Sequence, residues 1–123
     1  MRALVDTHIL LWWLADGARL EAPHREMIAS PENELFVSAI TIAEISIKAS
    51  LGKLTVPDGI VDIVVSEGFA HLPFTSAHAE ELRSLPWHHR DPFDRMLIAQ
   101  AMAERIPLLT ADSRIRAYDI DCV

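Results

Sequence analysis

Short apolar runs alternate along the chain with longer segments in which apolar residues recur at helical spacing. Short runs bounded by polar or turn-forming residues are typical of buried strands. We expect strands over Ala3 to Val5, Leu35 to Ser38, His71 to Phe74 and Ile106 to Leu109, and a final edge strand over Asp119 to Val123.

The longer segments predict helices. Pro31, Gly52 and Pro86 stand where three of them should end. The predicted helices cover Ile9 to Leu14, Leu20 to Ser30, Ile40 to Leu51, Ile60 to Glu67, Ala77 to Leu85 and Pro92 to Arg105. The segment Ile60 to Glu67 is rich in valine and isoleucine, so a strand is an alternative there.

Strands that alternate with helices predict an α/β fold. We expect a central, mainly parallel sheet with helices on both faces, which is a three-layer α/β/α sandwich. Such sheets bind ligands at the carboxyl ends of their strands. Half of the 123 residues are hydrophobic, enough for one sizeable core, so we expect a single domain over residues 1–123.

The composition also indicates where in the cell the protein acts. The longest apolar run, Ile9 to Ala15, is far shorter than the roughly 20 residues of a membrane span. Asp6 and His8 interrupt the N-terminal apolar stretch, so we expect no secretory signal and a cytoplasmic protein. Cys122 is the only cysteine, and no disulfide can form within the chain.

Four acidic residues stand where strands should end or helices should begin: Asp6, Glu44, Asp94 and Asp112. Carboxylates that converge at a buried sheet edge repel one another and lose hydration, so they need a cation, shared protons or a basic partner. Mg²⁺ and Mn²⁺ prefer oxygen ligands. We therefore predict that the four acids bind one or two of these ions.

Each acid also has a structural interpretation. Asp6 could cap the helix that starts near Ile9, and Asp112 could lie in a turn. The segment Thr41 to Glu44 matches a capping box, in which threonine caps a helix and glutamate bonds back to its amide. The metal interpretation therefore rests on all four acids together.

The segment Asp91 to Asp94 has the form of a helix start, because Pro92 suits the first helical position. We assign Asp91 mainly to capping, with accessory metal binding as a second role, and Asp94 to the metal.

The net charge of −7 argues at first against nucleic acid, because phosphate binding depends on lysine and arginine. One or two divalent cations among the four carboxylates would reduce this net charge to −5 or −3. The acidic balance therefore does not exclude RNA.

Basic and aromatic residues near the acids are candidates for contact with RNA. They are Arg90, Arg95, Arg114 and Arg116 for phosphates, and Trp12, Trp13 and Trp87 for base stacking. Pairing with surface carboxylates is the alternative for the arginines, and core or dimer-interface packing is the alternative for the first two tryptophans. The adjacent His88 and His89 have no fixed third metal ligand in the sequence, so we expect both to be solvated.

The chain resembles the PIN-domain ribonucleases, and in particular the VapC-type toxins of toxin–antitoxin pairs. The motifs that carry the resemblance are Leu4 to His8, Ser38 to Glu44, His89 to Gln100 and Leu109 to Asp112, which span nearly the whole chain. The resemblance implies a metal-dependent endoribonuclease, a parallel α/β/α fold, a homodimer and a cognate antitoxin that inhibits it. It makes Asp6, Glu44, Asp94 and Asp112 the catalytic and metal-binding quartet, with Ser38, Thr110 and Thr7 as supporting residues.

The expected reaction is hydrolysis of an RNA phosphodiester by a metal-activated water, which leaves a 5′-phosphate and a 3′-hydroxyl. A catalytically silent module that binds RNA or an antitoxin is the main alternative. A phosphorylatable receiver domain is a weaker one. Receivers need a lysine near the last strand, whereas the only lysines, Lys48 and Lys53, lie in the first half of the chain.

Overall fold

Four parallel strands form the centre of the protein in a computed structural model that describes residues 1–123. The strands are β1 (Arg2–Val5), β2 (Glu34–Ser38), β3 (Ala70–Leu72) and β4 (Leu108–Leu109). Their spatial order is β3-β2-β1-β4, and every pairing is parallel. The carboxyl ends of all four strands therefore meet at one edge of the sheet, where β1 and β4 lie side by side.

Six helices and two 3-10 turns connect the strands. They are α1 (Thr7–Leu14), α2 (Ala22–Ala29), α3 (Ala39–Ser50), α4 (Ile60–Ser66), α5 (Ser76–Glu80), η1 (Glu81–Arg83), α6 (Pro92–Glu104) and η2 (Ile115–Ala117). The valine-rich segment is a helix, not a strand. The helix predicted over Ala77 to Leu85 is shorter than expected, because after Glu80 it tightens into a 3-10 turn.

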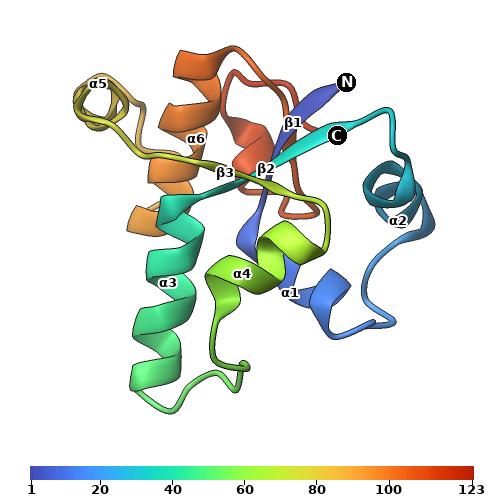
Figure 1. Ribbon diagram of the computed structural model, residues 1–123. Coiled ribbons are helices and arrows are strands. Elements are labelled where there is room, and N and C mark those ends of the chain that lie inside the picture. Colours follow the sequence, from blue (N-terminus) through green and yellow to red (C-terminus); the bar gives the residue numbers. More distant parts are fainter.

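Alternate residues of the central strands enter two separate cores, which places helices on both faces of the sheet. Ala3 and Val5 pack into a core that α1, α2 and α4 cover, whereas Leu4, between them, packs into the core that α6 covers. Figure 1 shows the sheet with α2 and α6 on opposite sides of it. The predicted three-layer α/β/α fold is confirmed.

The predicted edge strand over Asp119 to Val123 is wrong in its extent. Only Cys122 forms a bridge, parallel to Leu108, although the Val123 amide also donates to the Leu108 carbonyl at 3.0 Å. The partner strand β4 has only two residues, so it supports no longer pairing. The C-terminal segment nevertheless covers the outer edge of β4.

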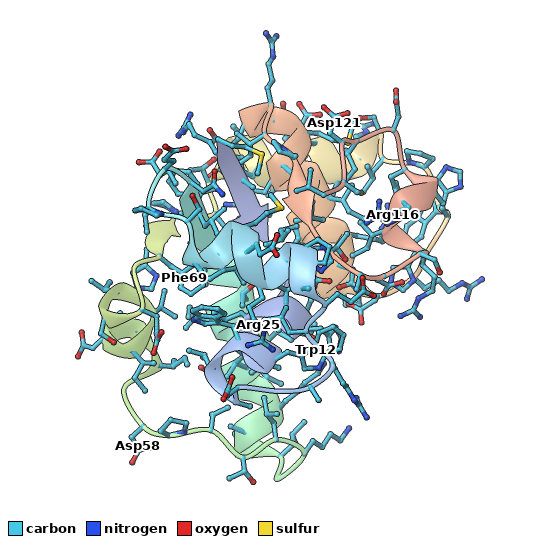
Figure 2. All side chains as sticks on the ribbon, turned by 90° about the vertical axis from the view of Figure 1, so that its right-hand side faces the viewer. Trp12, Arg25, Asp58, Phe69, Arg116 and Asp121 are labelled. Carbon is cyan, nitrogen blue, oxygen red and sulfur yellow. The ribbon has the colours of Figure 1, made fainter.

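The remaining features are peripheral to the sheet. The loop between α3 and α4, which carries Asp58, projects from the molecule at the opposite end from Arg116 (Figure 2). None of the helices combines the length and the apolar character needed to cross a membrane.

Candidate metal centre

Asp6 directly follows β1 and is 1% exposed. Its Oδ2 accepts a hydrogen bond of 2.7 Å from the hydroxyl of Thr110, which directly follows β4. Its Oδ1 is buried and has no hydrogen-bond partner. The residue stands before α1, yet its side chain makes no capping hydrogen bond, so the capping interpretation is wrong. Burial raises the pKa of Asp6 above its usual value.

Glu44 is buried on α3, a helix that Ser38 caps by accepting a hydrogen bond of 3.0 Å from the Ile40 amide. Thr41 lies inside the helix, so the capping box suggested by the sequence does not form. The Oε2 atom of Glu44 pairs with Lys48 one turn later, and Oε1 is buried with no partner. Glu44 is therefore not part of a capping box, and its Oε1 is a buried acceptor without a hydrogen-bond donor.

Thr7 connects the two helices that begin at this edge. Its hydroxyl lies 3.1 Å from that of Thr41, and both residues are buried. Thr41 lies one helical turn before Glu44. Thr7 thus holds α1 against the part of α3 that carries the glutamate, and it makes no hydrogen bond to an acid itself.

Asp94 lies in the first turn of α6, where Asp91 is the N-cap. The Asp91 carboxylate accepts hydrogen bonds from the amides of Phe93 at 2.9 Å and Asp94 at 3.0 Å, as predicted for a cap. Asp94 is buried, and its Oδ2 lies 2.7 Å from Nε2 of His89. Burial raises the pKa of Asp94 to about 6, against the opposing effect of the His89 hydrogen bond. The negative charges of Asp91 and Asp6 also contribute to this raised pKa.

Asp112 lies in the loop after β4. Its amide donates to the Thr110 hydroxyl at 3.0 Å, so one threonine fixes both Asp6 and Asp112. Its carboxylate accepts two hydrogen bonds from the Arg114 guanidinium, at 2.9 and 3.2 Å, and this pairing lowers the pKa of Asp112. The bound guanidinium is itself exposed.

The structure brings three of the four predicted acids close together. Ligand atoms of His89, Asp94 and Asp112 lie within 4.8 Å of one another, and Asp6 shares a surface hollow with Asp112. Glu44 approaches from α3: its hydrogen bond is the main cause that raises the pKa of Lys48, and the charge of Asp94 adds to it. Asp6, Asp94 and Asp112 therefore face one region of the sheet edge, and Glu44 lines the groove on the other side of α1.

This region is suited to a cation. A buried acceptor without a partner costs roughly 1–3 kcal/mol, and the site contains two of them, Oδ1 of Asp6 and Oε1 of Glu44. A divalent ion would supply the missing partner and offset the repulsion among the carboxylates. The predominance of carboxylate oxygen favours Mg²⁺ or Mn²⁺, and His89 adds one nitrogen.

His89 was not predicted as part of the site. Its side chain is only 8% exposed, in contrast to the solvated loop expected from the sequence. His88, its neighbour, packs edge-on against Tyr118 with ring centroids 4.9 Å apart. One signal in the sequence could have identified His89. It lies two residues before Asp91, and a capped helix start holds the preceding residues close to the first turn of the helix, where Asp94 lies.

Arg95 does not lie at the surface, in contrast to its prediction as a phosphate-binding residue. It is 4% exposed, and its guanidinium donates to the carbonyls of Leu85 and Pro86 and to the hydroxyl of Tyr118. Its guanidinium carbon also lies 3.7 Å from the ring centroid of Trp87. Arg95 therefore stabilises the loop before His89 and cannot reach RNA.

The other three arginines remain at the surface. Arg90 and Arg116 are exposed, and Arg116 donates to the Thr110 carbonyl at 3.1 Å, while Arg114 pairs with Asp112. Arg114 and Arg116 contact residues of the acidic site, and the role of all three in binding RNA stays a prediction.

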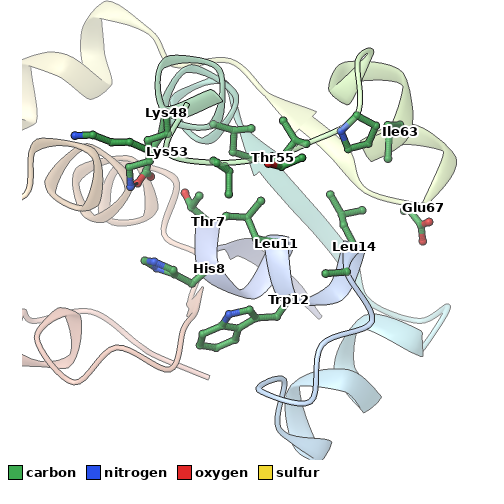
Figure 3. A pocket seen from close by; sticks show the side chains of 16 residues that line it. Thr7, His8, Leu11, Trp12, Leu14, Lys48, Lys53, Thr55, Ile63 and Glu67 are labelled. Carbon is green, nitrogen blue, oxygen red and sulfur yellow. Dashed lines mark hydrogen bonds and ion pairs between the residues drawn. The ribbon is translucent and has the colours of Figure 1, made fainter. Parts of the chain in front are cut away.

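Two hollows flank α1 beside the acids. A groove of about 660 Å³ lies between α1, α3 and the loop that follows α3, and Glu44 and Lys48 stand at its wall. Figure 3 shows this groove with Leu11 and Leu14 of α1 facing it. A second hollow of about 280 Å³ contains Asp6 and Asp112. The acidic site thus has an apolar surface on one side and a polar one on the other.

Comparison with known proteins gives consistent matches over nearly the full length. The family model described as "PIN domain" matches residues 3–121. The chain is 27% identical over 118 residues to Ribonuclease VapC22 of Mycobacterium tuberculosis, which covers 94% of this chain and 90% of that protein.

Solved structures share the fold. VapBC2 from Rickettsia felis, bound to a DNA fragment from its promoter, gives a TM-score of 0.74 at 15% identity and covers 100% of this chain and 98% of that one. A toxin–antitoxin complex from Klebsiella pneumoniae gives a TM-score of 0.66 at 23% identity and covers 98% and 95%.

Proposed function

Because this chain belongs to the PIN-domain family, we propose that it is a metal-dependent endoribonuclease that acts as the toxin of a type II toxin–antitoxin pair. The observation that supports the proposal is the proximity of Asp94 and Asp112 to His89, with Asp6 in the same hollow as Asp112 and with buried, unpartnered oxygens on Asp6 and Glu44. The relative that bears the name ribonuclease supports the same reaction class. The receiver-type alternative is set aside, because the PIN domain model matches residues 3–121 and these are nearly the whole chain.

In this proposal the four acids hold one or two Mg²⁺ or Mn²⁺ ions, with His89 beside Asp94. When bound, such an ion supplies Lewis-acid stabilisation of charge on the phosphodiester and lowers the pKa of a water. Thr110 keeps the carboxylate of Asp6 and the backbone of Asp112 in fixed positions. His89 holds the Asp94 carboxylate by its Nε2.

The products identify the nucleophile. Attack by water on phosphorus breaks the bond to the 3′ oxygen and leaves a 5′-phosphate and a 3′-hydroxyl. Attack by the RNA 2′-hydroxyl would instead leave a 2′,3′-cyclic phosphate. We expect 5′-phosphate ends, and detection of the cyclic phosphate would refute this mechanism.

The proposal is tested by incubating purified protein with defined RNAs, including tRNAs, in Mg²⁺ or Mn²⁺ and in EDTA. Asp94→Asn is the site variant. Asp58→Asn is the matched control, because it removes the same charge from an exposed loop. We expect metal-dependent cutting that Asp94→Asn abolishes and Asp58→Asn retains. Cutting that persists in EDTA and in Asp94→Asn would contradict the proposal.

Failure to cut any RNA, with Mn²⁺ still bound, would favour the alternative of a catalytically silent binding module. We favour the enzyme because the sequence contains all four acids and two of them have buried oxygens without a partner.

We further propose that a cognate antitoxin binds in the apolar groove beside Glu44. The groove offers leucines of α1 next to the acidic site, and structural neighbours of the chain are described as toxin–antitoxin complexes. Co-expression with a small protein encoded next to this one tests the proposal. We expect a stable complex in which RNA cutting is suppressed; full cutting by a complex of the two would contradict inhibition at this surface.

A homodimer in the cytoplasm is the remaining part of the proposal. Ile47 of α3, Leu51 directly after it, and Val61 and Val65 of α4 are 47–62% exposed, and exposed apolar side chains that lie near one another often mark an interaction surface. Light scattering after size exclusion should give twice the chain mass of 13.8 kDa. A mass of one chain at all concentrations would refute the dimer.

A further inference from the structure

The smaller hollow beside the acids contains residues that the proposed metal chemistry does not use. Asp6 and Asp112 form one side of it, and His8 and Trp12 of α1 and Arg19 of the next loop form the other. Its volume of about 280 Å³ lies just below the range of pockets that hold drug-sized ligands. It is therefore large enough for one nucleotide and too small for several.

The aromatic side of the hollow is open. His8 is exposed and Trp12 is half-buried, and they lie one helical turn apart on α1. Their ring centroids are 6.0 Å apart with planes tilted by 43°, so the two rings are not stacked face to face. Figure 3 shows His8 and Trp12 extending from the same side of the helix. An indole face beside a nuclease site is a stacking surface for a base.

Arg19 is the positively charged residue of the hollow. Arg19 is exposed and, like Arg83, Arg90, Arg105 and Arg116, takes part in none of the ion pairs of the structure, but it alone of these lines the hollow. In a chain of net charge −7, an unpaired guanidinium next to acidic residues has an evident use in binding a phosphate.

We propose that this hollow binds one unpaired nucleotide of the RNA next to the scissile phosphate, with its base stacked on Trp12 and a flanking phosphate at Arg19. The inference rests on the proposed nuclease function and specifies its substrate. A base inside an RNA duplex is stacked on both faces and cannot lie on an indole, so the proposed subsite requires an unpaired base at this position. His8 borders the base beside Trp12.

Binding is measured on the Asp94→Asn protein in Mg²⁺, so that the RNA is not cut. The probes are short oligo-A, oligo-C and oligo-U and a fully paired duplex, followed by tryptophan fluorescence. The chain has three tryptophans, and Trp12→Phe, Trp13→Phe and Trp87→Phe separate their signals. We expect quenching by at least one single strand, weaker quenching by the duplex, and loss of the quenching in Trp12→Phe only.

Affinity provides the second measurement. Trp12→Ala should weaken single-strand binding roughly 5- to 100-fold. Arg19→Ala, an exposed change that leaves the core intact, should reduce the slope of log affinity against log salt by about 1. Circular dichroism confirms that each variant is folded. Quenching that survives in Trp12→Phe, unchanged affinity in Arg19→Ala, or equal binding of the duplex would overturn the proposal.

The outcomes separate this inference from the nuclease proposal. If the wild type cuts RNA and Arg19→Ala and Trp12→Ala cut with an unchanged KM, the nucleotide subsite is wrong and the nuclease stands. If single strands bind through Trp12 but no RNA is cut, the subsite stands and the nuclease proposal is wrong.

Discussion

Replacing Asp94 by asparagine should abolish cleavage and yet stabilise the metal-free protein at neutral pH. Asparagine has nearly the same shape as aspartate and can still accept the hydrogen bond that Nε2 of His89 makes to Oδ2. The substitution therefore removes a buried negative charge and keeps the contact.

The size of the effect follows from the pKa of Asp94, which the fold raises from 3.8 to about 6. A carboxyl with a higher pKa in the folded than in the unfolded state makes the fold less stable when it ionises. The penalty is absent below about pH 4, grows as the pH rises and is complete somewhat above pH 6. Two pKa units correspond to at most ~3 kcal/mol, and solvent screening reduces the expected gain to about 1–2 kcal/mol.

The assay is urea unfolding in EDTA, followed by circular dichroism at pH values from about 4 to about 7.5. The free energy of unfolding of Asp94→Asn should equal that of the wild type at the acid end and exceed it at the neutral end. Asp58→Asn, an exposed change of the same kind, should alter neither. Adding Mn²⁺ should stabilise the wild type more than Asp94→Asn, because a ligand that binds only the folded state shifts unfolding.

A destabilised Asp94→Asn would refute this reasoning. If the metal-free variant unfolded more easily than the wild type by over about 1 kcal/mol at neutral pH, with Asp58→Asn unchanged, the charge of Asp94 would be stabilising. The carboxylate would then be satisfied within the fold and would need no cation.

Three other substitutions test the site. Thr110→Val should lower the free energy of unfolding by about 1–3 kcal/mol and weaken Mn²⁺ binding in calorimetry, because Asp6 loses its hydrogen-bond donor. Thr110→Ser should retain the stability and the Mn²⁺ affinity of the wild type. If Thr110→Val retained them too, Thr110 would not be needed to hold Asp6. Arg114→Ala should bring the pKa of Asp112 back up toward 3.8 in an NMR titration of metal-free protein, and an unmoved pKa would be the opposing result. Arg95→Lys should destabilise the fold by about 2–3 kcal/mol in urea unfolding, because hydrogen bonds to Leu85 and Tyr118 are lost. RNA binding per folded molecule should not change. Weaker RNA binding with unchanged stability would mean that Arg95 contacts RNA.

The fold could be predicted from sequence because its determinants are local. Four of the five short runs predicted as strands contain one, Asp91 and Pro92 start α6, and the alternation of Leu4 with its neighbours fits a sheet buried on both faces. The order of the strands could not be predicted, since nothing local to β4 indicates that it pairs with β1.

The acids of the candidate site could be proposed from the sequence, whereas their surroundings could not. An acid at a strand end can be identified from its own segment, whereas the place of His89 depends on Asp112, which comes from the far end of the chain. Arg95 looked like a surface residue because it is charged; only tertiary structure provides Tyr118, 23 residues later, as its partner. The unpartnered oxygen of Asp6 is likewise a property of the closed fold.

The pairing of β1 with β4 also determines when the site can exist during protein synthesis. The hydrogen bond from Thr110 to Asp6 joins residues 104 positions apart. Asp6 is therefore synthesised early, but the threonine that binds it is synthesised only after most of the domain. Contacts of such long sequence separation form late, after the intervening loop entropy has been overcome. A nascent chain on the ribosome would therefore carry no assembled acidic centre until residues 108–112 emerge and dock beside β1. The parallel pairing of the first and last strands therefore makes the acidic centre one of the last parts of the domain to assemble.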